Sequence, residues 1–245
     1  MSAYDKFSKI YDKLMYDCDY DKWSQYLVAT IKDGKDGVLN GADLACGSGN
    51  VTIRLKAAGL NVFGVDTSEE MLRIAAEKTR SHGQKINYIC VDAVKFEAPR
   101  KLDFVTMCLD GVNYVEKQKI KPLFQNVFDN LKENGVFLFD ISSAYKLLEY
   151  IGENVFYDDG DDVTYLWTNK LDEKRQFVDY EIAFFVLDGE IYRRFDESHR
   201  LFAHDKDELL EILKQVGFRD VKVAGSEFES VKGKFDMRYN FIARK

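Results

Sequence analysis

Two glycines in the segment 43–50, which reads DLACGSGN, could bring the backbone close to a bound nucleotide. Gly47 and Gly49 carry no Cβ, so a ligand can lie directly against the main chain there. An apolar stretch precedes the segment and an amphipathic stretch follows it, which is the order of a strand, a tight loop and a helix. The free amide groups at the start of that helix would bind an anionic group of the ligand.

Two aspartates follow the next two apolar stretches. Asp66 ends the stretch 62–65 and Asp92 follows the stretch 86–91. In a nucleotide-binding βαβ unit, a carboxylate about 20 residues after the first glycine accepts hydrogen bonds from ribose hydroxyls, and Asp66 has this place. Ligands bind at the carboxyl edge of an open parallel sheet, so the loop and both aspartates together predict a nucleotide site at that edge.

A second group of residues could move or orient a proton. Glu197 and His199 are two positions apart, so an extended backbone would place both side chains on one face. Asp110 and Asn113 follow the stretch 104–109 and could bind an amine or orient a nucleophile. The alternatives are a structural strand histidine at position 199 and a loop hydrogen-bonding residue at position 110.

The elements that must hold these residues alternate between short apolar strands and amphipathic helices. Apolar residues at helical spacing predict one or two helices over 4–33, within an N-terminal helical cap over 1–40. From 41 to 142 the pattern gives five strands with helices between them, and Thr67-x-x-Glu70 predicts a capping box. A helix capped by Asp205 and strands near 219–228 and 237–243 follow. This alternation predicts a Rossmann-like α/β fold, with a seven-stranded, mostly parallel sheet and helices on both faces.

Residues 154–203 interrupt the alternation. Apolar residues recur at every second position from 178 to 186, and Asp188-Gly189 predicts a hairpin turn. We therefore expect an antiparallel β insertion after the fifth strand, carried by one domain made of 1–153 and 204–245. Its many aromatic residues suit a substrate lid, and a dimer surface is the alternative. The oligomeric state stays open between monomer and homodimer.

The composition is typical of a globular protein. The chain has 245 residues, a formal net charge of −7 and 46 % hydrophobic residues. No apolar run approaches the ~18 residues of a membrane span, and the first residues lack the apolar core of a signal peptide. The four cysteines are scattered without a C-x-x-C pair, so we expect a cytoplasmic location and neither a metal site nor a disulfide framework. No block of lysine and arginine marks a nucleic-acid binder, so a small-molecule partner is favoured.

The motifs resemble those of the class I S-adenosylmethionine-dependent methyltransferases. The family's nucleotide loop reads Asp-Leu-Gly-Cys-Gly-x-Gly and is matched by 43–49, and further matches are Asp66-Thr67-Ser68-x-x-Met71, Asp92-Ala93 and Leu131-Lys132-x-x-Gly135. Ala45 stands where the family usually has glycine, and we expect only slight crowding from its methyl group. The resemblance implies S-adenosylmethionine as cofactor and S-adenosylhomocysteine as product.

The resemblance also implies a role for each matched residue. The loop that would back the methionine moiety contains Asp43, Ala45, Cys46, Gly47 and Gly49. Asp66, which Thr67 follows, would hold the ribose, and Met71 would pack by the adenine. Asp92 and Ala93 would meet the adenine amino group, and Leu109 would face the other side of the adenosine. Tyr11 looks like the tyrosine that caps the cofactor's carboxylate in related small-molecule methyltransferases.

The layout is similar to that of nucleotide-sugar amine N-methyltransferases and uncharacterised bacterial relatives. We therefore expect in-line transfer of a methyl group to a small-molecule acceptor, with an amine as first candidate and His199, Glu197 and Asp110 as catalytic residues. The alternatives are an RNA or protein methyltransferase and a non-catalytic protein that binds the cofactor. A nicotinamide-dependent oxidoreductase is disfavoured, because Thr52 stands where its fingerprint needs a third glycine.

Overall fold

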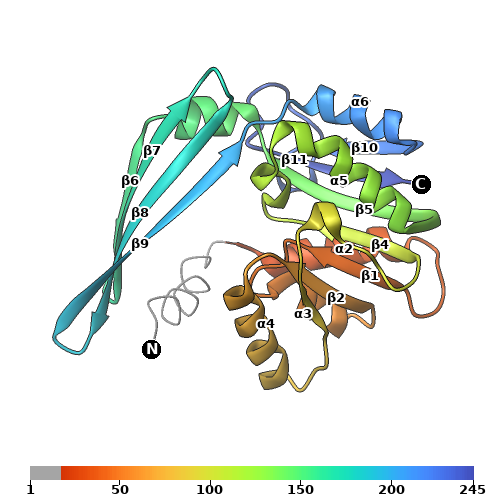
Figure 1. The fold of residues 1–245 in the computed structure, drawn as a ribbon, viewed down its shortest axis with the longest axis horizontal. Coiled ribbons are helices and arrows are strands. Elements are labelled where there is room, and N and C mark those ends of the chain that lie inside the picture. The colour runs from red at the N-terminus through yellow and green to blue at the C-terminus, as the bar shows by residue number, and fades with distance from the viewer. Residues whose placement is uncertain (1–17) are drawn as a thin grey trace.

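A seven-stranded sheet forms the centre of the molecule, of which the computed structural model describes residues 18–245 (Figure 1). The elements before the insertion are α2 (Tyr20–Lys32), β1 (Asn40–Leu44), α3 (Asn50–Ala57), β2 (Asn61–Asp66), α4 (Glu69–Ser81), β3 (Tyr88–Cys90), η1 (Ala93–Lys95), β4 (Leu102–Met107), η2 (Gly111–Tyr114), α5 (Lys117–Asn130), β5 (Leu131–Ser142) and the π-helix η3 (Tyr145–Ile151). After it come α6 (Lys206–Val216), β10 (Asp220–Ala224), η4 (Ser226–Phe228) and β11 (Arg238–Arg244).

The strand order confirms the predicted sheet. It runs β10-β11-β5-β4-β1-β2-β3, in which β11 is antiparallel to both its neighbours and the other pairs are parallel. Because β1 lies between β2 and β4, the chain leaves β1 toward one side of the sheet and later returns to the other. A crevice forms at such a reversal, outside the carboxyl ends of the strands, and the site is expected there.

Two hydrophobic clusters cover the two faces of this sheet. Along β5, Phe137 and Phe139 belong to the cluster that holds the apolar sides of α5 and α6. Val136 and Leu138 point the other way, into the cluster that holds α2 and α3. Because β5 is buried on both faces from residue 135 onward, apolar residues are needed at successive positions there, and its sequence over 136–139 is continuously apolar.

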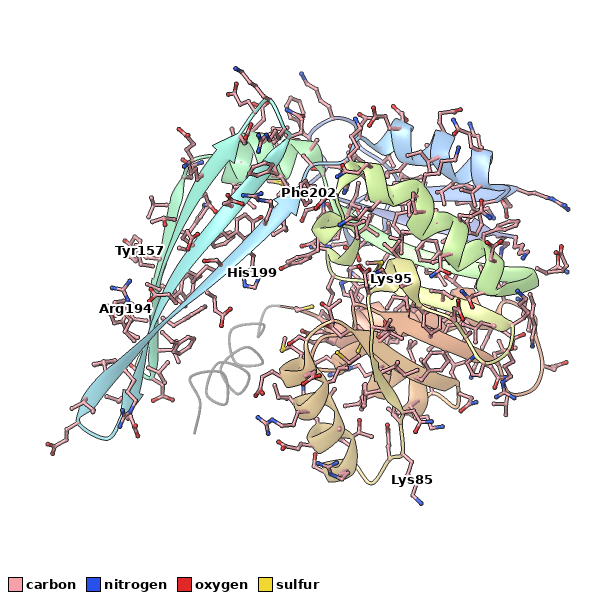
Figure 2. The ribbon with its side chains drawn as sticks, in the orientation of Figure 1. Lys85, Lys95, Tyr157, Arg194, His199 and Phe202 are labelled. Atoms are coloured by element: carbon pink, nitrogen blue, oxygen red, sulfur yellow. The ribbon has the colours of Figure 1, made fainter. Side chains whose placement is uncertain are left out.

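The insertion forms a separate antiparallel sheet of four strands, β6 (Val155–Asp159), β7 (Val163–Asp172), β8 (Phe177–Asp188) and β9 (Ile191–Phe202), in the order β6-β7-β8-β9. Its hairpin between β8 and β9 turns at Gly189 (φ +71°), as predicted. Figure 2 shows His199 on the face of this sheet that is turned toward the seven-stranded sheet, whereas Tyr157 and Arg194 lie on the other face. We call these the inner and the outer face of the insertion.

Several local predictions were wrong. Ser68, not Thr67, caps α4, because the Ser68 hydroxyl accepts from the Met71 amide at 3.3 Å and the helix begins at Glu69. Strand β10 ends at Ala224, earlier than expected, and the chain turns into η4. The π-helix η3 had no sequence signal. Within residues 18–245, no helix is long and apolar enough to cross a membrane.

Candidate active site

The loop between β1 and α3 has the backbone geometry that a close ligand requires. Gly47 (φ +52°) and Gly49 (φ +77°) both lie in the left-handed region, and Gly49 begins α3 without a side chain that caps the helix. A Cβ on Gly49 would lie 2.8 Å from the hydroxyl of Tyr88, so glycine is required there on steric grounds also. The first amides of α3 are therefore presented at the crevice, where an anionic group of a ligand would meet them.

Asp66 ties this loop to the next helix. Its carboxylate accepts from the Gly47 amide at 2.8 Å and from the Ser68 amide at 2.9 Å. Met71 borders the same loop, since a Cβ on Gly47 would lie 3.7 Å from the Met71 methyl group. The end of β2, the glycine loop and the start of α4 therefore form one cradle.

Asp43 fixes the end of β1, from which the loop begins. It is buried, and its two oxygens accept from Thr52 at 2.6 Å and Thr106 at 2.8 Å, which ties β1 to α3 and β4. Burial raises its pKa to about 6. Cys46 is half-buried, and desolvation raises the pKa of its thiol well above the ordinary value, so this thiol is unsuited to be a nucleophile.

The remaining cofactor candidates line the carboxyl edge beyond Asp66. The Thr67 carbonyl accepts from the Cys90 thiol at 3.4 Å, which joins the ends of β2 and β3. Asp92 is exposed and caps η1 by accepting from the Val94 amide at 2.9 Å, and Ala93 follows it. Their contacts with a cofactor stay predictions. Tyr11 lies outside the described residues.

A pocket opens between these elements. Its lining includes Tyr20 of α2, Ala45, Cys46 and Gly47 of the loop, and Cys108 and Leu109 after β4. The backbone of the glycine loop, a helix start and the carboxylate of Asp66 at the end of β2 meet at its edge. These are the groups that a nucleoside with a zwitterionic tail requires, so the residues present fit S-adenosylmethionine.

Ala45 has a cost that the sequence did not suggest. Its φ is +51°, in the left-handed region that disfavours every residue with a Cβ, so backbone strain is added to the slight crowding that we expect.

Replacing Ala45 with glycine is therefore expected to raise the free energy of unfolding by about 0.5–1 kcal/mol, because relief of this strain exceeds the entropy that glycine loses on folding. Urea unfolding measures the change. The matched control is Ala58→Gly at the end of α3, where φ is −76° and glycine offers no relief. A loss of stability in both variants would contradict the strain at position 45.

The tip of β4 carries two strained residues in succession. Leu109 (φ +60°) and Asp110 (φ +69°) are both left-handed. Their amides donate to the carboxylate of Asp140 on β5, at 2.6 Å and 3.2 Å. Asp140 is fully buried, and sequence reasoning missed it. The available signal was an acidic residue within the apolar run VFLFDI at 136–141.

Arg238 of β11 neutralises this carboxylate and its neighbour. The guanidinium donates to Asp110 at 2.6 Å and also contacts Asp140. Burial alone would raise the pKa of Asp110, but the charges of Arg238 and Lys146 and the hydrogen bonds from Ser142 and Arg238 together outweigh it and hold that pKa below the ordinary value. For Asp140, burial dominates and raises the pKa to about 6. A carboxylate with a lowered pKa is a weak base, so the geometry favours a positioning role for Asp110.

Asn113 is a structural residue, and the expectation that it meets an acceptor is wrong. It is buried, its side-chain nitrogen donates to the carbonyls of Ser142 at 3.1 Å and Phe202 at 2.9 Å, and its oxygen accepts from the Ser142 amide at 2.9 Å. These bonds fasten η2 to the end of β5 and to the end of the insertion. They use both hydrogens of the side-chain amide, and burial keeps the residue away from a ligand.

The insertion brings the two acid–base candidates toward the tip of β4. Glu197 and His199 lie on the inner face of β9, and the ring of His199 meets that of Tyr114 in η2 edge-on, with centroids 6.0 Å apart. Desolvation lowers the pKa of His199 and raises that of Glu197. His199 is therefore neutral at neutral pH and able to accept a proton. His204 is buried, and its Nε2 lies 3.2 Å from the Val112 carbonyl oxygen.

Comparisons with known proteins agree with this geometry. The family model "Methyltransferase domain" matches residues 42–135. A solved S-adenosylmethionine-dependent methyltransferase from Clostridium acetobutylicum ATCC 824 is 38 % identical, covers 99 % of both chains and has a TM-score of 0.90. The candidate methyltransferase YqeM of Bacillus subtilis (strain 168) is 34 % identical over 244 residues, which are 99 % of this chain and 97 % of that protein. The sugar N-methyltransferase KedS8 from Streptoalloteichus sp ATCC 53650 has the same fold at 16 % identity, with a TM-score of 0.77 over 100 % of this chain and 93 % of that one.

Proposed function

This chain belongs to the S-adenosylmethionine-dependent methyltransferases, and we propose that it methylates an amine of a small molecule held under the insertion. The observation that carries the proposal is the contact between His199 and Tyr114, because it joins the inner face of the insertion to the tip of β4. The acceptor would lie between these two surfaces. KedS8, which shares the fold, is by its title a sugar N-methyltransferase, and this supports an amine acceptor.

The cofactor, when bound, supplies a methyl group that its sulfonium makes electrophilic. The segment 45–49 would hold its methionine part and Asp66 its ribose hydroxyls. Thr67, Met71, Asp92, Ala93 and Leu109 would surround its adenosine, at the edge where the structure has them. Asp43 and Asp140 would keep the loop and the tip of β4 in the conformations that this arrangement requires.

The insertion would supply the rest of the chemistry. An amine attacks only through a free lone pair, so its ammonium form must lose a proton. A neutral imidazole nitrogen of His199 would take this proton, and Glu197 beside it would stabilise the imidazolium that results. The aromatic inner face over 154–203 would act as a lid and keep water from the transferred methyl group.

Removing the carboxylate of Asp66 is expected to weaken binding of S-adenosylhomocysteine by about 1–3 kcal/mol, roughly 5–150-fold, because the ribose hydroxyls lose a partly buried acceptor. Isothermal titration of Asp66→Ala measures the loss, and thermal unfolding shows whether the loop remains folded. Glu77→Ala, on the exposed face of α4, is the control. Unchanged affinity in Asp66→Ala would refute the ribose role.

The acceptor class is tested with S-adenosylmethionine that carries a labelled methyl group. The purified protein is incubated with pools of low-mass amines, low-mass alcohols, RNA and protein, and the label is then followed by size and by acid lability. The proposal predicts label in the amine pool, lost in His199→Asn and kept in His82→Asn. Transfer to RNA or protein alone would overturn the small-molecule proposal.

A further inference from the structure

Two neighbouring rows of side chains on the inner face of the insertion contain polar groups, whereas the rest of that face is mainly apolar. Strand register aligns Trp167, Ile182 and Glu197 in one row across β7, β8 and β9. The next row holds Asn169, Tyr180 and His199. Because residues directly opposite each other on paired strands share a face, the six side chains form one patch, which we call the inner-face patch.

Two polar groups of the inner-face patch lack hydrogen-bond partners, although the side-chain nitrogen of Asn169 donates to the Asn154 carbonyl at 2.7 Å. The indole N–H of Trp167 and the side-chain oxygen of Asn169 are both shielded from solvent and unpartnered. Desolvation dominates the pKa shifts of Tyr180, Glu197 and His199, and no hydrogen bond contributes to any of them within the described residues. A buried donor or acceptor without a partner costs about 1–3 kcal/mol, so a donor and an acceptor of this kind in one patch point to a ligand that pairs them.

The surroundings of the patch restrict the ligand further. The ring of Trp167 lies between those of Phe156 and Tyr180, with centroids 5.0 Å and 4.8 Å away, so the ligand must offer an apolar surface. The patch contains a carboxyl group in Glu197 and neither lysine nor arginine. The charge of Arg238 reaches Tyr180, but its guanidinium is already held by Asp110 and Asp140. A carboxylate or phosphate bound here would therefore bury its charge beside Glu197 and would compete with two aspartates for that cation.

The patch also lies beside the reacting centre. His199 contacts Tyr114 of η2, and Tyr180 lies close enough to Asp110 and Arg238 for their charges to act on its hydroxyl. Figure 2 shows His199 on the side of β9 that is turned toward the seven-stranded sheet. A molecule on the patch would therefore reach the tip of β4, where the methyl group is transferred.

We propose that the inner-face patch is the acceptor subsite and that it selects an amino alcohol. Glu197 and His199 receive the hydrogens of the amine, Trp167 donates to a hydroxyl oxygen, and the rings cover the carbon skeleton. The end of the acceptor that docks here carries no carboxylate or phosphate. This inference rests on the proposed function for the position of the transferred methyl group, but binding to the patch does not require transfer.

Three probes of one shape test this selection: 2-amino-1-phenylethanol, 2-phenylethylamine, which lacks the hydroxyl, and mandelate, which replaces the aminomethyl group with a carboxylate. Each is titrated calorimetrically into the protein saturated with S-adenosylhomocysteine. We expect the amino alcohol to bind about fivefold more tightly than the amine and at least about tenfold more tightly than mandelate. The proposal would be overturned if mandelate bound as tightly as the amino alcohol, or if the amino alcohol did not bind.

Trp167→Phe keeps an aromatic ring and removes only the N–H group. It is expected to abolish the preference for the amino alcohol over the amine, while Tyr157→Phe on the exposed outer face leaves the preference unchanged. A preference that persists in Trp167→Phe refutes the role of the indole. Failure of the proposed function looks different: the labelled methyl group then reaches no amine in the transfer assay, although the patch still distinguishes the probes.

Discussion

Replacing Asp140 with alanine is expected to lower the free energy of unfolding by about 3–5 kcal/mol. The fully buried carboxylate accepts hydrogen bonds from the amides of Leu109 and Asp110 and so holds the backbone of these two residues in the left-handed region. It also contacts Arg238, whose guanidinium pairs with Asp110. Without it, two amides lose their acceptor, and the strained tip of β4 loses the bonds that oppose its relaxation. Urea unfolding of Asp140→Ala measures the loss.

The control for this prediction is an aspartate whose ion pair is exposed. Asp179 on the outer face of the insertion receives two hydrogen bonds from Arg200, at 2.6 Å and 2.7 Å, but solvent screens this pair. Asp179→Ala should therefore leave the unfolding midpoint almost unchanged. Equal effects of the two substitutions would mean that Asp140 does not support the tip of β4. In Asp140→Ala we also expect weaker binding of S-adenosylhomocysteine, since Leu109 borders its pocket.

Replacing His199 with asparagine is expected to lower turnover by about 10²–10⁴-fold and to leave the affinity for S-adenosylhomocysteine unchanged. Desolvation lowers the pKa of His199 below its ordinary value of 6.5, so the neutral base predominates at neutral pH. Activity of the native protein should fall as the pH falls through this lowered pKa, because the imidazole is then already protonated. In His199→Asn that acid limb of the kcat profile should disappear.

His82→Asn is the matched control, because His82 is exposed at the end of α4 and its ring bonds to Ser81 and Lys78 of that helix. Its turnover and pH profile should equal those of the native protein. Unchanged turnover in His199→Asn would return His199 to the role of a structural strand histidine, the alternative that its sequence context left open.

The sequence predicts those features of the fold and site that depend on local patterns. Gly47, Gly49 and Asp66 lie within a single βαβ unit, so their spacing alone brings them together. Glu197 and His199 share a face because β9 is extended, which its alternating sequence implies. The cap at Asp205 is confirmed by its bonds to the amides of Asp207 and Glu208, both 2.9 Å long.

Features that depend on distant partners could not be predicted in this way. Arg238 reaches Asp110 from the far end of the chain, and no local pattern links β11 to the tip of β4. Asn113 resembled a ligand-binding residue because it follows the stretch 104–109, and its bonds with Ser142 and Phe202 show that it is structural. The strain at Ala45 follows from a backbone angle that an alanine gives no reason to expect.

A crystal structure of the protein with S-adenosylhomocysteine would test the central claim most directly, namely that the glycine loop and the inner face of the insertion are two halves of one site. We predict that the ribose hydroxyls meet Asp66 and that the sulfur faces the space between the tip of β4 and His199. A ligand whose ribose lies away from Asp66, or whose sulfur is turned away from the insertion, would contradict this account.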